Sequence, residues 1–203
     1  VFGDGIRDLK FFRFGVFEFA NRPIVIARSG FSKQGGFEIY LEDGTKGMDL
    51  WNALFEAGKP FDVRAGCPNI IERVEGGLLS YGNDMTSRNT PHECGLDKFC
   101  DLGSAIGCIG RDALLRVDKE GPVQKIRPVA ISGDAVPPLQ AYWPVLADEV
   151  AVGRISSAAW SPDFNTNVSI GMIHLTHWDA GTALTVKTPA GDRAAVVQEK
   201  FWN

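Results

Sequence analysis

The feature that most constrains the fold is a series of short β-type segments at near-regular spacing after about residue 121. Turn signals such as Val136-Pro137-Pro138 and Ala190-Gly191-Asp192 separate them. Strands of this kind are typical of a small barrel or sandwich. We place the boundary of this β-rich domain near Glu120-Gly121-Pro122, giving domains of residues 1–120 and 121–203. The predicted strands cover residues 126–132, 148–152, 154–160, 168–175, 182–188 and 193–198.

The region before this boundary mixes strand and helix patterns, which predicts an α+β domain. Residues 9–28 are expected to be strand material that begins with a core strand over 9–14 and contains a turn at Asn21-Arg22-Pro23. Residues 36–42 form a further predicted strand. Helix signals cover residues 46–57, 67–76 and 110–117. Pro68 lies in the first turn of the second predicted helix.

Composition sets plain bounds on function. The chain has 203 residues and a net charge of −4, which argues against a nucleic-acid partner, and it contains no apolar run of membrane-spanning length. Cys67, Cys94, Cys100 and Cys108 show no metal-type CxxC spacing, so buried free thiols in a reducing cytoplasm are favoured over disulfides or a metal site. We therefore expect a cytoplasmic protein with a small-molecule substrate, no membrane partner, no bound metal and, as a further expectation, a homodimer.

One acidic residue, Glu38, lies inside an apolar strand pattern directly behind the glycine-rich stretch 30–36. Strand alternation puts Glu38 and Tyr40 on one face and Phe37 and Ile39 on the other. A carboxylate buried alone costs several kcal/mol, so if Glu38 is buried it should have a partner. Without other information an ordinary strand-edge carboxylate is the simpler interpretation, but a ligand with N–H donors also fits.

Residues 28–39 resemble the folate-binding signature of the aminomethyltransferase family, the T-protein of the glycine cleavage system and its relatives. The matching positions are Arg28, Gly30, Gly36, Phe37, Glu38 and Ile39. Further motifs follow in the family's order: residues 72–84, 90–96, 109–114 and 153–162. The resemblance implies part of a cloverleaf-like α+β folate-binding fold followed by a small C-terminal β-barrel. It also implies tetrahydrofolate as cofactor, bound by Glu38.

Within this family the chain is most similar to the branch that demethylates dimethylsulfoniopropionate (DMSP). The supporting stretches are residues 34–40, 66–69 and 95–100. Our alignment puts Asn69 where T-proteins carry an arginine that assists the folate site. The resemblance implies methyl transfer from the DMSP sulfonium to N5 of tetrahydrofolate, and an N-terminal region ahead of Val1.

The site residues implied by this comparison are few. Glu38, Tyr40 and Arg28 are the expected folate contacts, and Phe31 and Tyr40 are the expected aromatic contacts of the sulfonium cation. Arg28 or Lys33 is a candidate partner of the DMSP carboxylate. Phe12 and Phe14 are candidates for lining the site, although ordinary core packing is the simpler interpretation. No catalytic acid or base is assigned.

Two alternatives to DMSP demethylation stay open: aminomethyl transfer from a carrier protein, and a non-catalytic folate-binding domain. Other conspicuous residues have structural interpretations. Glu93, after Thr90-Pro91, is predicted to cap a turn. His174 and His177 are expected on opposite strand faces, which disfavours a metal site. Asn83 and Asp84 are expected in a structural turn, and Trp143, Trp160 and Trp178 are expected to anchor packing.

Overall fold

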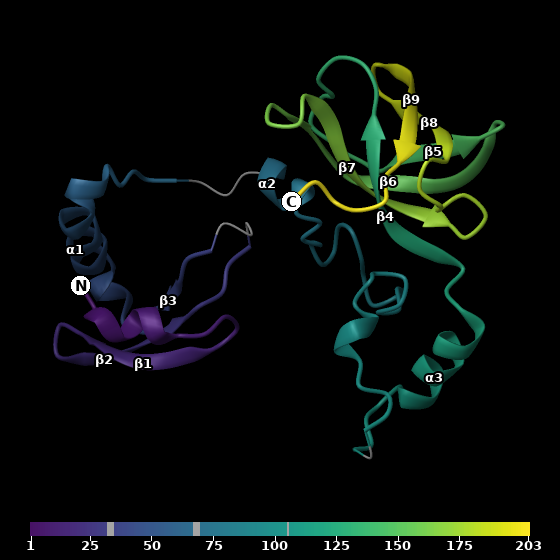
Figure 1. The fold of residues 1–203 in the computed structure, drawn as a ribbon. Coiled ribbons are helices and arrows are strands. Elements are labelled where there is room, and N and C mark those ends of the chain that lie inside the picture. Colours follow the sequence, from purple (N-terminus) through teal and green to yellow (C-terminus); the bar gives the residue numbers. More distant parts are fainter. Residues whose placement is uncertain (32–34, 67–69, 105) are drawn as a thin grey trace. The chain divides into compact units, whose positions relative to one another are not determined.

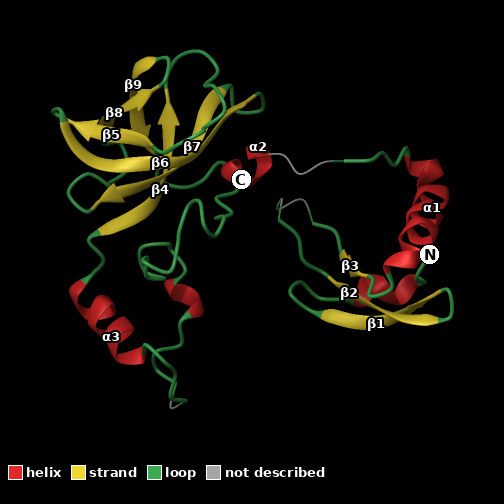
Figure 2. Cartoon of the chain, turned by 180° about the vertical axis from the view of Figure 1, so that it is seen from behind, coloured by secondary structure: helices red, strands yellow, loops and turns green. Residues whose placement is uncertain are grey.

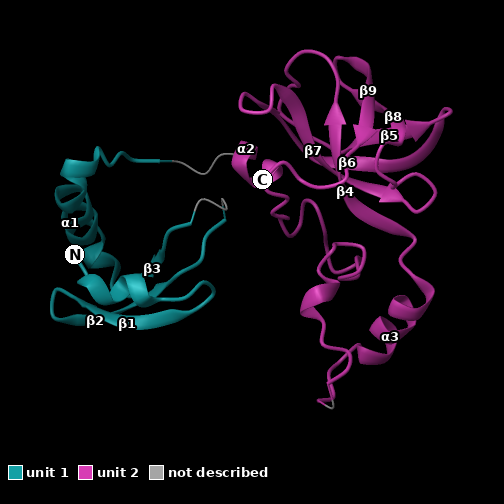
Figure 3. Ribbon diagram, in the orientation of Figure 1, with its two compact units in different colours: residues 1–69 teal, residues 70–203 magenta. Residues whose placement is uncertain are grey.

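The computed structural model describes residues 1–31, 35–66, 70–104 and 106–203. These form two compact units, Val1–Asn69 and Ile70–Asn203, coloured separately in Figure 3. Each unit has its own hydrophobic clusters and is described by itself. The division expected near Glu120-Gly121-Pro122 follows sequence patterns rather than compactness, and it stays a prediction.

The first unit is an antiparallel sheet with one helix against it. The strands β1 (Phe14–Phe19), β2 (Arg22–Ala27) and β3 (Glu38–Tyr40) pair in that order. Helix α1 (Gly47–Gly58) confirms the helix predicted over residues 46–57 (Figure 2). Leu50 and Leu54 of α1 pack on the sheet face formed by Ile24, Ile26 and Ile39. The 3₁₀ turns of this unit are Asp4–Asp8, Gly44–Lys46 and Lys59–Phe61.

The core strand predicted to begin at residue 9 was wrong at its start. The chain turns at Phe11 and Phe12, and Phe12 has a positive φ of 58°. The amide of Arg13 donates to the carbonyl of Lys10 at 3.0 Å, which closes this turn. Both phenylalanine rings are exposed and contact each other at a tilted angle, with centroids 4.3 Å apart. The following hairpin turn lies at Ala20 and Asn21, both with positive φ, so Pro23 belongs to β2 rather than to the turn.

The second unit contains a closed β-barrel, which decides between the barrel and sandwich alternatives (Figure 1). Its strand order is β4-β7-β6-β5-β8-β9, and every neighbouring pair is antiparallel. The barrel interior is filled by branched aliphatic side chains and by Trp143. The strands are β4 (Gln124–Ile131), β5 (Trp143–Ala147), β6 (Val150–Ser161), β7 (Thr166–His174), β8 (Ala183–Thr188) and β9 (Gly191–Val197).

The barrel differs from the prediction around residues 143–161. Strand β5 was missed, and the segments 148–152 and 154–160 belong to one long strand, β6. The turn lies at Asp148 and Glu149, both with positive φ, inside the predicted strand segment 148–152. Gly153 is inside β6 because a Cβ there would lie 2.4 Å from the carbonyl oxygen of Met172 on β7. The glycine thus serves close strand approach instead of a chain reversal.

Helix α2 (Ile70–Glu75) packs on the outside of the barrel, and Val74 is fully buried against Val168, Ile170 and Met172. The predicted start of this helix at residues 67–69, Pro68 included, lies outside the described residues. Helix α3 (Arg111–Glu120) confirms the third predicted helix and extends it by one turn. A short 3₁₀ turn covers Asp97–Phe99.

Candidate functional site

The predicted folate residues lie on the open face of the β1-β2-β3 sheet. Glu38 and Tyr40 are both exposed, whereas Ile39 between them packs into the core of the unit, as alternation predicts. Tyr40 leaves 53% of its surface exposed. The carboxylate and the phenol therefore share one accessible surface.

The strand register shows what surrounds these two side chains. Glu38 is paired with Ala27 of β2 and Tyr40 with Val25. On β1, Phe14 is paired with Ala27 and Val16 with Val25, and both side chains are exposed, Phe14 by 71%. Cross-strand partners project to the same side of a sheet. The open face thus carries two rows, Phe14–Ala27–Glu38 and Val16–Val25–Tyr40, which we call the Glu38 face.

This arrangement puts one carboxylate and one phenol at the edge of an apolar platform. Phe14, Val16 and Val25 can contact the flat surface of a heterocycle, while Glu38 accepts hydrogen bonds from N–H groups at its rim. Glu38 is not buried, so it carries no large desolvation cost. Its Oε2 accepts a hydrogen bond from the hydroxyl of Ser29, which orients the carboxylate.

Arg28 has a partner within the unit. Its Nη1 donates to the carbonyl oxygen of Leu9 at 2.9 Å, which ties the chain before β1 to the end of β2. Phe31 lies in the β2–β3 loop with its ring exposed. Lys33 lies outside the described residues, as does Asn69. The roles of Glu38, Tyr40, Arg28 and Phe31 stay predictions.

Sequence reasoning missed Ser29, Val16 and Val25 as members of this face, and it favoured a core position for Phe14. Ser29 could have been found, because it lies next to Arg28 in the same motif. The positions of Phe14, Val16 and Val25 on this face follow from the strand register, which cannot be read from a local sequence pattern.

In the second unit, the matched sequence motifs build a buried polar network rather than a reaction site. Asp84, fully buried, accepts from Arg73 Nη1 at 2.7 Å and from the amide of Ser80 at 2.8 Å. Its other oxygen accepts from the hydroxyls of Ser156 and Ser157, each at 2.6 Å. The network joins α2, the following loop and β6, which agrees with the structural role expected for Asp84.

Glu93 forms the predicted cap. Its amide donates to the hydroxyl of Thr90 at 3.3 Å, and its carboxylate accepts from the amide of Thr90 at 2.8 Å. This reciprocal pair is a capping box. In the described part of the chain Cys94, Cys100 and Cys108 are free thiols. Burial, together with the Glu93 carboxylate, raises the pKa of Cys94 to about 11.

Two negative findings apply to the described residues only. They contain no group of three or more His, Cys, Asp or Glu side chains placed to hold a metal ion. They also contain no helix long and apolar enough to cross a membrane.

The family model named GCVT N-terminal domain matches residues 5–104, and the model named glycine cleavage T-protein C-terminal barrel domain matches residues 125–202. The chain therefore belongs to the glycine cleavage T-protein family, as the sequence motifs indicated.

Similar proteins divide into two groups by name. The chain is 55% identical over 202 residues to the dimethylsulfoniopropionate demethylase DmdA of Ruegeria pomeroyi. This match covers all of this chain and 55% of that protein. It is 31% identical over 166 residues to an aminomethyltransferase of Symbiobacterium thermophilum, covering 80% of this chain and 43% of that protein. The chain thus spans about half the length of the relatives it matches.

A solved structure supports the fold. The aminomethyltransferase T of the glycine cleavage system from Bartonella henselae superposes with a TM-score of 0.75 at 22% sequence identity, covering 89% of this chain and 50% of that one. At this identity the likeness concerns the fold alone, and it confirms the predicted α+β fold with its C-terminal barrel.

Proposed function

We propose that the whole protein is a tetrahydrofolate-dependent methyltransferase that demethylates DMSP. The observation that carries this proposal is the 55% identity, along the entire chain, to a protein named as a DMSP demethylase. The identity to a protein named as an aminomethyltransferase is 31%.

The proposed reaction is a direct methyl transfer. The lone pair of N5 of tetrahydrofolate attacks a methyl carbon of the sulfonium, the C–S bond breaks with its electron pair going to sulfur, and the N5 proton is released to solvent. The products are methylmercaptopropionate and 5-methyl-tetrahydrofolate. Because the sulfonium is already an activated leaving group, the protein's task is to hold nitrogen and carbon in line at attack distance.

In this proposal the Glu38 face receives the pterin. The Glu38 carboxylate accepts hydrogen bonds from the amino-pyrimidine edge, each contributing about 1.5–3 kcal/mol. Phe14 and Val25 support the flat ring, and Ser29 keeps the carboxylate oriented. Arg28 is the proposed polar contact beside Glu38.

The sulfonium cation has no hydrogen-bond donors, so aromatic faces suit it. Tyr40 and Phe31 are the proposed contacts, each worth about 0.5–2 kcal/mol. Both rings are exposed in the first unit. Free thiols at Cys94, Cys100 and Cys108 support a reducing compartment, and we place the enzyme in the cytoplasm. A homodimer is likewise proposed, to be checked by light scattering.

The test uses the full-length protein with tetrahydrofolate and DMSP, and products are identified by mass spectrometry. We expect 5-methyl-tetrahydrofolate and methylmercaptopropionate in equal amounts. Methylene-tetrahydrofolate formed from an aminomethylated carrier protein, with no turnover of DMSP, would replace the proposal by aminomethyl transfer. Folate binding without turnover of either donor would indicate a non-catalytic folate-binding protein.

A further inference from the structure

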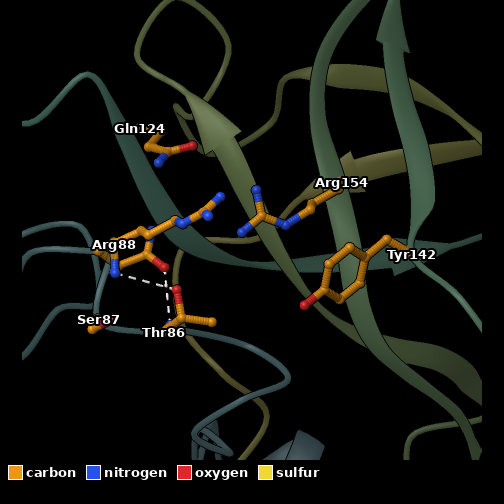
Figure 4. Close-up of a pocket in the computed structure, with 7 residues that line it drawn as sticks. Thr86, Ser87, Arg88, Gln124, Tyr142 and Arg154 are labelled. Carbon is orange, nitrogen blue, oxygen red and sulfur yellow. Dashed lines mark hydrogen bonds between the residues drawn. The ribbon is translucent and has the colours of Figure 1, made fainter.

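The second unit has a pocket of about 560 Å³ beside the barrel, with no part in the Glu38 face (Figure 4). The loop after Asp84, the start of β4, the segment ahead of β5, and β6 each contribute to its wall. Its volume lies in the range of small-molecule sites, roughly 300–1,000 Å³. The lining residues are Thr86, Ser87, Arg88, Asn89, Gln124, Tyr142 and Arg154.

Two arginines give the pocket its charge. Figure 4 shows the guanidinium groups of Arg88 and Arg154 pointing toward each other across the pocket. Within the described part of the chain, neither forms an ion pair with a carboxylate. The buried Nε of Arg154 has no hydrogen-bond partner there either. Like charges placed face to face repel unless an anion lies between them.

The other arginine of this region shows the usual structural arrangement by contrast. Arg73 donates to the Asp84 carboxylate, the Leu78 carbonyl and the Ser157 hydroxyl, so its charge is neutralised inside the protein. Arg154 is half-buried, yet its guanidinium has no comparable set of hydrogen bonds to the described residues. Its guanidinium instead lies over the ring of Tyr142, 5.1 Å from the centroid.

The remaining contacts hold the pocket wall without using either guanidinium. Tyr142 donates its hydroxyl to the carbonyl of Asn83 at 2.7 Å, which fixes the ring under Arg154. Glu93, the carboxylate behind the wall, has both oxygens engaged: Oε1 accepts from Gln124 at 2.9 Å, and Oε2 accepts from the amide of Thr90. Among the described residues Glu93 forms no ion pair with Arg88 or Arg154, and its hydrogen bonds hold the loop and Gln124 instead.

We propose that this pocket binds an oxyanion group, a carboxylate or a phosphate, of a small molecule, held between Arg88 and Arg154. Planar guanidinium groups bind both oxyanions through paired N–H donors. The stacked, half-buried Arg154 supplies the fixed side of the site, and the exposed Arg88 closes over the ligand. The pocket exceeds the size of a free ion, so the ligand is an organic molecule that carries the oxyanion.

The experiment is calorimetric titration of the full-length protein with inorganic phosphate and, separately, with citrate at low salt. We expect saturable binding of at least one probe. We also expect Arg88→Gln and Arg154→Gln each to weaken it by about tenfold or more, because each removes one charge-assisted pair. Binding should weaken as sodium chloride is raised. The preferred probe identifies whether phosphate or carboxylate is the natural group.

Arg116→Gln is the matched control, since it makes the same charge change on α3, outside the pocket, and should leave binding unchanged. Arg154→Lys keeps the charge and should bind with intermediate affinity. Unfolding curves establish that each variant is folded, and Arg88 is exposed, so its variant tests the site even if Arg154→Gln is unstable. Absence of binding by both probes, or equal binding by wild type and the Arg88→Gln variant, would overturn the proposal.

Discussion

At the scale of single residues, Glu38 is the side chain on which the proposed function depends most. Replacing it by Gln keeps the shape and removes the charge, so we expect tetrahydrofolate to bind about tenfold or more weakly. Fluorescence titration of the full-length protein measures this. Glu18→Gln is the matched control, because Glu18 is an exposed carboxylate of β1, which is separated from β3 by β2, and it is paired with Pro23, outside the two rows of the Glu38 face. Equal affinity of the Glu38→Gln variant and wild type would refute the role of Glu38.

Cys94 gives a prediction at alkaline pH. Its pKa is raised from 9.0 to about 11 in the folded protein, so between these pH values the unfolded chain loses a proton that the folded chain keeps. The stability from this group is present below pH 9 and is lost as pH rises toward 11. We expect Cys94→Ala to show a smaller loss of unfolding free energy over that interval than wild type. Identical pH profiles of the two proteins would contradict the raised pKa.

At the scale of elements, the attachment of α2 and its loop to β6 depends on Asp84. Replacing Asp84 by Ala leaves the buried Arg73 charge without its partner and removes the acceptor of Ser156 and Ser157. Breaking a buried pair in this way costs about 3–5 kcal/mol. We expect that loss in urea unfolding.

The surface pair of Lys187 and Asp192, 3.5 Å apart, provides the comparison. Exposed pairs contribute about 0–1 kcal/mol, so Asp192→Ala should leave the urea midpoint nearly unchanged. A similar small effect for Asp84→Ala would mean that the buried network contributes little to stability.

At the scale of the whole molecule, the position of the domain boundary is testable by truncation. The barrel cluster and the cluster under α2 have all their members within Ile70–Asn203. We therefore expect a fragment of residues 70–203 to unfold cooperatively by itself. A fragment of residues 121–203 lacks Val74, Arg73 and Asp84 and should be less stable, as measured by thermal unfolding. Equal stability of the two fragments would instead favour the boundary predicted near residue 120.

Several features were predictable because their causes are local. The apolar period of residues 46–57 predicts α1, and Thr90 and Glu93 stand at capping-box spacing. The turn between β8 and β9 lies at Pro189 and Ala190, next to the predicted signal Ala190-Gly191-Asp192, whose last two residues begin β9. The alternation that gives Glu38 and Tyr40 a common side is likewise a property of the strand backbone. The resemblance of the motifs to the family predicted tetrahydrofolate as the cofactor and a barrel as the C-terminal domain.

Local cues failed where a distant partner decides the conformation. The run of aromatic residues 9–14 has strand propensity, yet Phe12 takes a positive φ, and the pairing with β2 starts as regular strand only at Phe14. Glycine is common in turns, but Gly153 lies within β6. The backbone of β7 comes so close to this position that only a residue without a Cβ fits there.

By itself, the sequence determined the types of the main elements, the family and which side of β3 carries Glu38, because these follow from neighbours a few positions apart. Only the tertiary structure decided that Phe14, Val16 and Val25 join Glu38 on one face. It also decided that Arg73 meets Ser157, 84 positions away, and that Arg88 and Arg154 face each other without an ion-pair partner among the residues that the structure describes. Such juxtapositions depend on strand register and long-range packing, which no local sequence pattern contains.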